Sequence, residues 1–208
     1  MSTNKDTEII KTYKEAIKQN YKDLFPISYD DNCILLMCFL LTQQSNQVKM
    51  FLNKADFDQI YPYLECFQKY LPTKMNNLSL IVTKDVLINE KLTQAMPFKT
   101  DEHFNETHPL ISELPYASSV RLLDLEGGKE IPSFIIFDKH YLVQISGENK
   151  FLCSLNPRAT TSSFNRFNLL QEIFKKISEQ STPFTPQQIT SYHLNLTDFL
   201  RENNRTNN

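Results

Sequence analysis

The chain contains very little glycine: only three of its 208 residues, at positions 127, 128 and 147. Loops that cradle phosphates use several glycines to bring backbone N–H groups onto the ligand, so the Walker and dinucleotide-binding motifs are absent. Gly-x-Ser-x-Gly is missing too, which argues against the strained turn that exposes the nucleophile of a serine hydrolase. The sequence therefore gives no sign of a phosphate-cradling loop or of a serine hydrolase.

Cys-x-x-Cys pairs are also absent, although the chain has four cysteines, at positions 33, 38, 66 and 153. Their apolar surroundings predict buried free thiols rather than zinc ligands or a redox pair. His103 and His108 lie near two carboxylates, but a helix would place these histidines about 140° apart at roughly 100° per residue. We interpret the segment 102–108 as a polar loop and expect neither a metal nor a cofactor.

A long hydrophobic run is missing as well. The most apolar segment, 33–41, is far shorter than the roughly 20 residues that a membrane-spanning helix needs. The N-terminal residues are polar and include acids, so we expect a cytoplasmic protein. The formal net charge of −2 gives no general attraction to phosphate backbones or anionic lipid. Nucleic acid and membranes are therefore disfavoured as partners.

Apolar material is sufficient for a core, because 40% of the residues are hydrophobic and 12% are aromatic. The length suits one domain. We expect an α/β fold in which helices flank a mixed central sheet. A helical extension over 1–29 would pack on an α/β domain over 30–180, and 181–208 would form a C-terminal helix and a frayed tail.

Hydrophobic periodicity predicts the elements of the first half. The apolar run around 31–45 follows residues suited to helix capping, so we favour a buried helix there, with a strand as the open alternative. Pro26 would end the preceding unit. The predicted helices are 7–21, 31–45, 56–70 and 86–96, and the predicted strands are 47–54, taken as the first strand, and 78–82.

In the second half, short runs of β-branched and aromatic residues predict strands, and three of these form an antiparallel meander. An apolar stripe from Phe164 to Ile177 predicts a strong amphipathic helix. The predicted strands are 119–125 and then the meander of 134–137, 141–145 and 151–155. The predicted helices are a short one ending near 114, then 163–177 and 185–200.

The segment from Ile131 to Asp138, with the surrounding order of elements, resembles a phospholipase D-like domain over residues 30 to 178. Members of that superfamily carry His-x-Lys-x4-Asp on the strand before a hairpin. With Asp138 aligned to the family aspartate, the family histidine falls on Ile131 and the family lysine on Ser133. We refer to 131, 133 and 138 as the aligned positions.

The resemblance implies chemistry in which one histidine attacks phosphorus, a second protonates the leaving oxygen and lysines hold the phosphate charge. Ile131 can neither attack nor transfer a proton, and the chain has no second His-x-Lys pair. We therefore expect a binding or regulatory module that has lost catalysis and acts through a protein partner. The resemblance also makes a homodimer worth testing.

Two alternatives remain open at this point. One is a phosphodiesterase or nuclease with a non-standard site formed by Asp138, His140, Lys150 and Arg158, although 138–140 also suits an ordinary exposed turn. The other is nucleic-acid binding without catalysis, through cations interleaved with aromatic rings. That second set comprises Lys150, Arg158, Arg166, Lys175 and Lys176 with Phe151, Phe164 and Phe167. The phenylalanines suit a core stripe, which favours a solvated basic face instead.

Overall fold

The computed structural model describes most of the predicted domain, and the statements below concern that part. The described residues are 3–28, 33–54, 56–57, 60, 77–84, 119–125, 130–146, 148 and 150–183. The predicted helices 56–70, 86–96 and 185–200 and the short helix ending near 114 lie largely or wholly outside these residues. So do Cys66, His103, His108 and His193.

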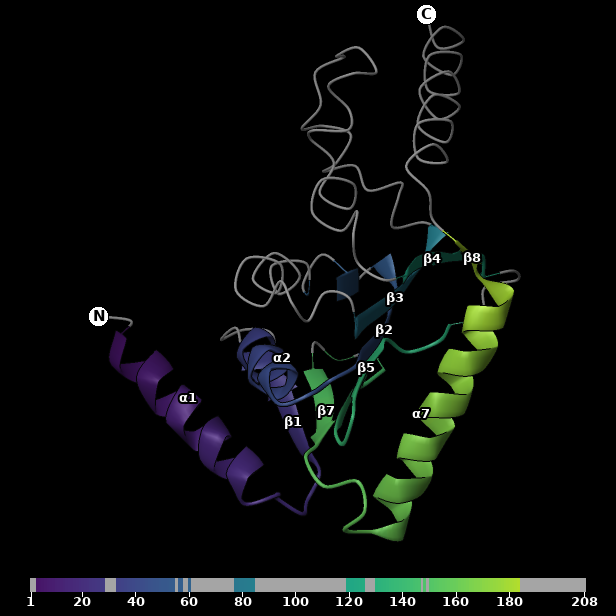
Figure 1. Cartoon of the computed structure of the whole chain (residues 1–208). Coiled ribbons are helices and arrows are strands. Elements are labelled where there is room, and N and C mark those ends of the chain that lie inside the picture. The colour runs from purple at the N-terminus through teal and green to yellow at the C-terminus, as the bar shows by residue number, and fades with distance from the viewer. Residues whose placement is uncertain are drawn as a thin grey trace, which may run out of the picture.

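The described residues form an eight-stranded mixed sheet with helices on both faces, as the sequence predicts in outline (Figure 1). The strand order is β1-β7-β6-β5-β2-β3-β4-β8. The strands are β1 (Phe25–Ser28), β2 (Val48–Leu52), β3 (Leu78–Thr83), β4 (Ser119–Leu123), β5 (Phe134–Phe137), β6 (Tyr141–Gln144), β7 (Lys150–Ser154) and β8 (Thr182–Pro183). The helices are α1 (Thr3–Lys18), α2 (Cys33–Gln43) and α7 (Thr161–Gln180).

Strand directions divide the sheet into two parts. The central strands β2, β3 and β4 are parallel, while β5 runs antiparallel to β2 and continues into an antiparallel β5-β6-β7 meander. The meander predicted from residues 134–155 is therefore confirmed. The edge strands β1 and β8 pair antiparallel with β7 and β4, so the segment 1–29 contributes a strand to the sheet as well as α1.

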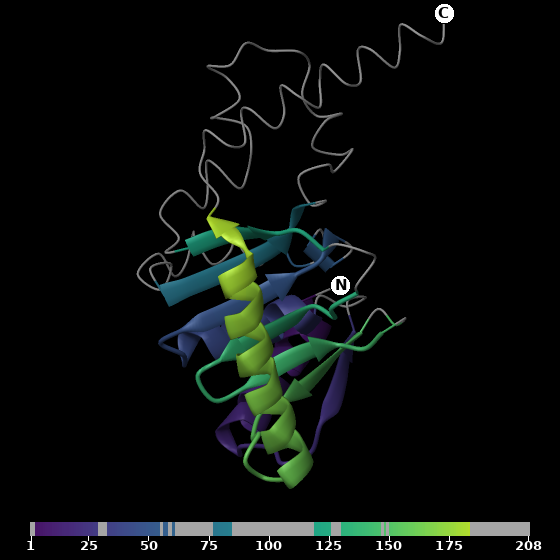
Figure 2. The same cartoon turned by 90° about the vertical axis from the view of Figure 1, so that its right-hand side faces the viewer.

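Two apolar clusters sandwich the sheet. Alternation along β2 explains the division, because Val48, Met50 and Leu52 belong to the cluster under α1 and α2, whereas Phe51 belongs to the cluster under α7. A strand buried on both faces loses clean polar-apolar alternation, which is why Phe51 breaks the pattern in the sequence. Figure 2 shows α7 crossing one face of the sheet.

The sequence analysis predicted neither of the edge strands, β1 and β8. Pro26 was expected to end a unit, but it lies inside β1, and Pro183 lies in β8. Proline has no N–H to donate, so it is tolerated at a sheet edge and discourages the edge from pairing with another strand. Consequently 47–54 contains the second strand rather than the first. The helical interpretation of the apolar run after Cys33 is confirmed by α2.

Candidate functional site

The Asp138 carboxylate follows β5 and accepts two backbone hydrogen bonds from the residues just before β2. Asn46 N donates to Asp138 Oδ2 at 2.8 Å, and Gln47 N donates to Oδ1 at 2.9 Å. Hydrogen bonds to an ionised acceptor are stronger than neutral ones. Asp138 therefore fixes the start of β2 against the end of β5, across more than ninety residues of sequence.

Ser133 makes the corresponding contact at the other end of β2. Its side chain is fully buried, and its Oγ accepts a hydrogen bond of 2.9 Å from Asn53 N, just after β2. Its carbonyl accepts from Gln144 N at 2.8 Å. The neighbouring aligned position, Ile131, is partly buried and packs against the apolar cluster under α7. Both ends of β2 are thus held by aligned positions that flank β5.

A short polar network continues from Asn53. Its Oδ1 accepts a hydrogen bond from Asp56 N at 3.0 Å, and the buried Asp56 carboxylate accepts one from Gln144 Nε2, also at 3.0 Å. Buried carboxylates need such partners because desolvation of a charge is costly. The network ties the segment after β2 to the end of β6.

His140 is buried, with 7% of its surface exposed, so the interpretation of 138–140 as an exposed turn is wrong for this residue. Its Nδ1 lies 2.8 Å from the carbonyl oxygen of Leu155, which can only accept, so Nδ1 carries the proton. Burial lowers the pKa of His140, and the hydrogen bond to Leu155 opposes that shift. The imidazole joins the β5–β6 hairpin to the end of β7.

The other two residues of the alternative phosphodiesterase site are Lys150 and Arg158. Lys150 Nζ lies 3.4 Å from Glu148 Oε2, and both side chains are about half exposed. Arg158 is exposed in the loop before α7. In the described part of the chain, no hydrogen bond or ion pair joins any two of Asp138, His140, Lys150 and Arg158.

A polar depression of about 270 Å³ lies between β2, β5 and α7. Its lining includes Asp138 and Lys49, which extends from β2 toward α7. Lys49 Nζ donates to Gln171 Oε1 at 2.9 Å and lies 5.8 Å from the centre of the Phe174 ring. Sequence reasoning missed this site. The available signal was a lysine in the middle of a strand whose other residues are all hydrophobic.

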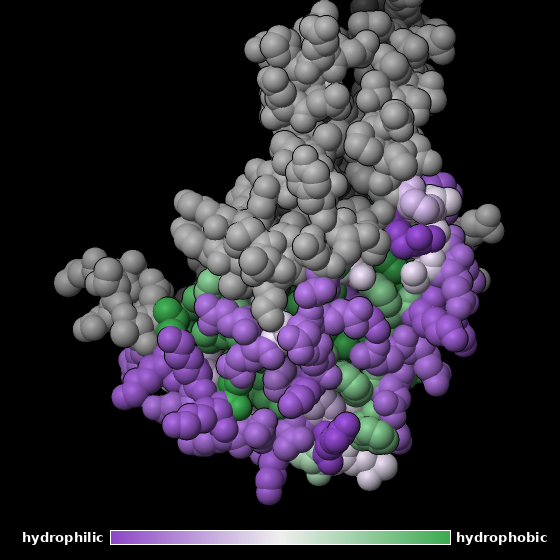
Figure 3. All heavy atoms as spheres, in the orientation of Figure 1, coloured by the Kyte–Doolittle hydropathy of each residue, from purple (hydrophilic) through white to green (hydrophobic). Residues whose placement is uncertain are grey.

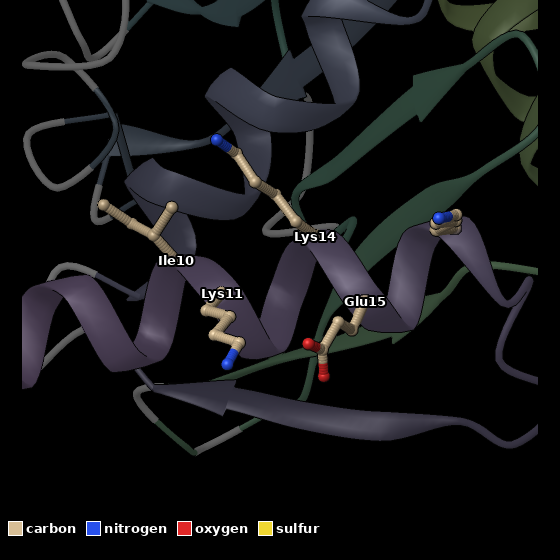
Figure 4. A pocket seen from close by; sticks show the side chains of 5 residues that line it. Ile10, Lys11, Lys14 and Glu15 are labelled. Carbon is tan, nitrogen blue, oxygen red and sulfur yellow. The ribbon is translucent and has the colours of Figure 1, made fainter.

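A second depression, of about 350 Å³, runs along the outer face of α1 (Figure 4). Lys11, Lys14 and Lys18 line it together with Ile10 and Glu15. Their spacing of three and four residues places the three lysines on one side of the helix, and Figure 4 shows the side chains of Lys11 and Lys14 extending toward opposite edges of that side. The opposite side of α1, with Tyr13, Ala16 and Ile17, packs on the core.

The cations predicted near α7 lie on a face that is mostly polar. Lys175 and Lys176 are exposed, and Phe151 is buried, as a core stripe with a solvated basic face requires. Phe164 differs from that prediction because 43% of its surface is exposed. Polar side chains cover much of the described surface in Figure 3, with apolar ones visible between them.

The described cysteines are free thiols, as the sequence predicts, although Cys33 is only partly buried. Cys38 and Cys153 are buried and free, Cys33 is free and partly buried, and burial raises the pKa of Cys38 and Cys153. Within the described ranges, no cluster of three or more histidine, cysteine and acidic side chains could hold a metal ion. No described helix is long and apolar enough to cross a membrane.

Comparison with protein-family models gives no match, and comparison with curated proteins gives none either. Among solved structures, the chain is similar to TrmBL2, an archaeal chromatin protein whose structure shows a novel mode of DNA binding. The TM-score is 0.44 and the sequence identity is 10% over 88% of this chain. The chain spans 62% of the length of that protein.

Proposed function

We propose that this protein is a phospholipase D-like binding or regulatory module that has lost phosphodiester chemistry and acts through a protein partner. The aligned positions support this proposal. Ile131 packs in an apolar cluster, where a catalytic member would need an attacking imidazole. Ser133 is fully buried and cannot supply the positive charge that a phosphate requires.

The observation that carries the proposal is the pair of contacts at the two ends of β2. Ser133 Oγ accepts from Asn53 N after the strand, and the Asp138 carboxylate accepts from Asn46 N and Gln47 N before it. We name this pair of contacts the β2 clamp. Because Ser133 and Asp138 each hold backbone amides at an end of β2, their role in this proposal is to support the strand.

Hydrolysis of bis-p-nitrophenyl phosphate by the purified full chain tests the loss of chemistry. We expect the chain and its Asp138→Asn variant to release p-nitrophenol only at the rate of buffer. Turnover by the unaltered chain that disappears in Asp138→Asn, but persists in Ser146→Ala, would overturn the proposal. That result would favour the alternative enzyme centred on Asp138 and His140.

Self-association is the first partner interaction to measure, because the proposed relationship makes a second copy a natural candidate. Light scattering over a range of protein concentrations gives the mass directly. A mass near 24.4 kDa at every concentration would exclude the second copy and leave a different protein as the partner. A doubled mass that persists on dilution would identify the homodimer.

Nucleic-acid binding without catalysis is a second candidate, favoured by the lysines along α1. Lys11, Lys14 and Lys18 line one depression on α1, where each ammonium group could contact a phosphate, although Glu15 lines the same depression. Binding of this kind weakens steeply with salt because counterions are released. Fluorescence anisotropy with labelled single-stranded DNA should show that slope in the unaltered chain and in Lys175→Gln, and lose it when all three α1 lysines become glutamine. Absent or salt-independent binding would dismiss this candidate.

A further inference from the structure

The depression between β2, β5 and α7 contains an ammonium group that has no anionic partner among the described residues. Lys49 is partly buried, and within the described residues its Nζ contacts the neutral Gln171 amide and the Phe174 ring face but forms no ion pair. A charge withdrawn from water is stabilised most by an opposite charge. The Lys49 ammonium has three donors, of which Gln171 takes one.

The negatively charged Asp138 carboxylate lines the same depression and can accept further hydrogen bonds. Its two oxygens each accept one backbone N–H, whereas an ionised carboxylate offers about four acceptor positions. The side-chain amides of Gln47 and Gln171, also in the lining, can both donate and accept. Donors and a positive charge at Lys49 therefore share one small space with acceptors and a negative charge at Asp138.

We propose that this depression binds a small zwitterion, with the ligand's carboxylate against Lys49 and its ammonium group against Asp138. The lining carries one positive and one negative charge, so a simple anion would be attracted by Lys49 and repelled by Asp138. A dipolar ligand aligned with both groups gains from each. The volume of about 270 Å³ suits a ligand the size of an amino acid.

This inference names a ligand for the proposed binding module, but its site is separate from Ser133 and Ile131. Failure of the zwitterion test would leave the lost phosphodiester chemistry untouched, since that claim is measured by hydrolysis. Conversely, turnover of bis-p-nitrophenyl phosphate would overturn the proposed function without deciding what Lys49 binds.

Titration of ¹⁵N-labelled full chain, followed by two-dimensional NMR, tests the proposal with defined probes. Glycine, β-alanine and 4-aminobutyrate vary the distance between the two charges, and acetate and methylammonium each carry one charge. We expect the backbone amides of Gln47 and Gln171 to shift with at least one zwitterion. That zwitterion should bind about tenfold or more tightly than either single ion, because a single ion makes only one of the two charge contacts.

Two lysine variants make the result specific. Lys49→Met keeps the aliphatic stem beside Phe174 but removes the charge, and it should abolish the zwitterion shifts. Lys176→Met removes an exposed charge on α7 and should titrate like the unaltered chain. Equal binding of acetate and the best zwitterion, unchanged titration in Lys49→Met, or no shift with any probe would each overturn the proposal.

Discussion

The two faces of the sheet differ in what their covering helices allow. On one face, α1 and α2 cover a cluster of buried apolar side chains that includes Met50, Leu80 and Val82. On the other face, the single helix α7 crosses the sheet (Figure 2), and polar side chains such as Lys49 and Arg121 extend toward it. Arg121 Nε donates to Ser181 Oγ at 2.8 Å, just after α7.

Dimensions explain this difference. Helix α7 crosses the strands (Figure 2) and is about 10 Å in diameter with its side chains, whereas a five-residue strand such as β2 is about 17 Å long. One helix therefore cannot seal the whole face, and a polar depression remains beside it. The comparison indicates that the face under α1 and α2 provides stability, while the face under α7 has room for a ligand.

The largest expected effect is a loss of stability on the face under α1 and α2. Truncation of the fully buried Leu80 to alanine should lower the free energy of unfolding by about 3 kcal/mol, because it leaves a cavity among packed side chains. Leu169→Ala, at a position 54% exposed on α7, should change it by less than about 0.5 kcal/mol. Urea denaturation measures both. Equal losses for the two variants would contradict the tight packing of Leu80 in the cluster under α1 and α2.

The next effect concerns the start of β2. Asp138→Ala removes the acceptor of two backbone hydrogen bonds and should cost about 1–2 kcal/mol, reduced by the exposure of the carboxylate. Asp138→Asn retains one oxygen and should lose about half as much. Thermal and urea unfolding of the two variants provide the comparison. A loss in neither variant would mean that these contacts do not stabilise the fold.

At the other end of β2, Ser133→Ala should cost about 1 kcal/mol, because Asn53 N–H loses its acceptor. Ser146 provides a matched control, since it is exposed beyond β6. Ser146→Ala should leave the free energy of unfolding unchanged. If the two serine variants unfold at the same urea concentration, Ser133 does not support the strand.

The smallest effect is a pH dependence from His140. Its pKa is lowered in the folded state, so below about pH 6.5 the unfolded chain binds a proton that the folded chain does not. The contribution of His140 to the free energy of unfolding is therefore fully present above about pH 6.5 and declines as the pH falls toward the pKa of the folded state. His140→Gln should remove this part of the decline. NMR titration showing a His140 pKa at or above 6.5 would contradict the prediction.

Elements with strong periodicity could be predicted from the sequence. The stripe from Phe164 to Ile177 predicted the helix α7, although Phe164 itself is exposed, and the short runs after Ser133 predicted the β5-β6-β7 meander. The edge strands could not be found, because β1 and β8 are short, contain proline and take their pairing from strands distant in the sequence.

The candidate site was less predictable. The segment 138–140 was expected to form an ordinary exposed turn, but the Asp138 carboxylate accepts from amides just before β2, which are distant in the sequence. His140 forms its hydrogen bond with the carbonyl of Leu155, just after β7, and no local sequence pattern encodes that contact. Lys49 meets Gln171 only because α7 returns across the sheet.

The central claim is that Ser133 and Asp138 act as the β2 clamp, and amide hydrogen exchange tests it most directly. In Asp138→Ala, which removes both acceptor oxygens, protection should fall at the amides of Asn46 and Gln47 and remain at Asn53. In Ser133→Ala, it should fall at Asn53 and remain at the other two. Unchanged protection at all three amides in both variants would contradict the claim.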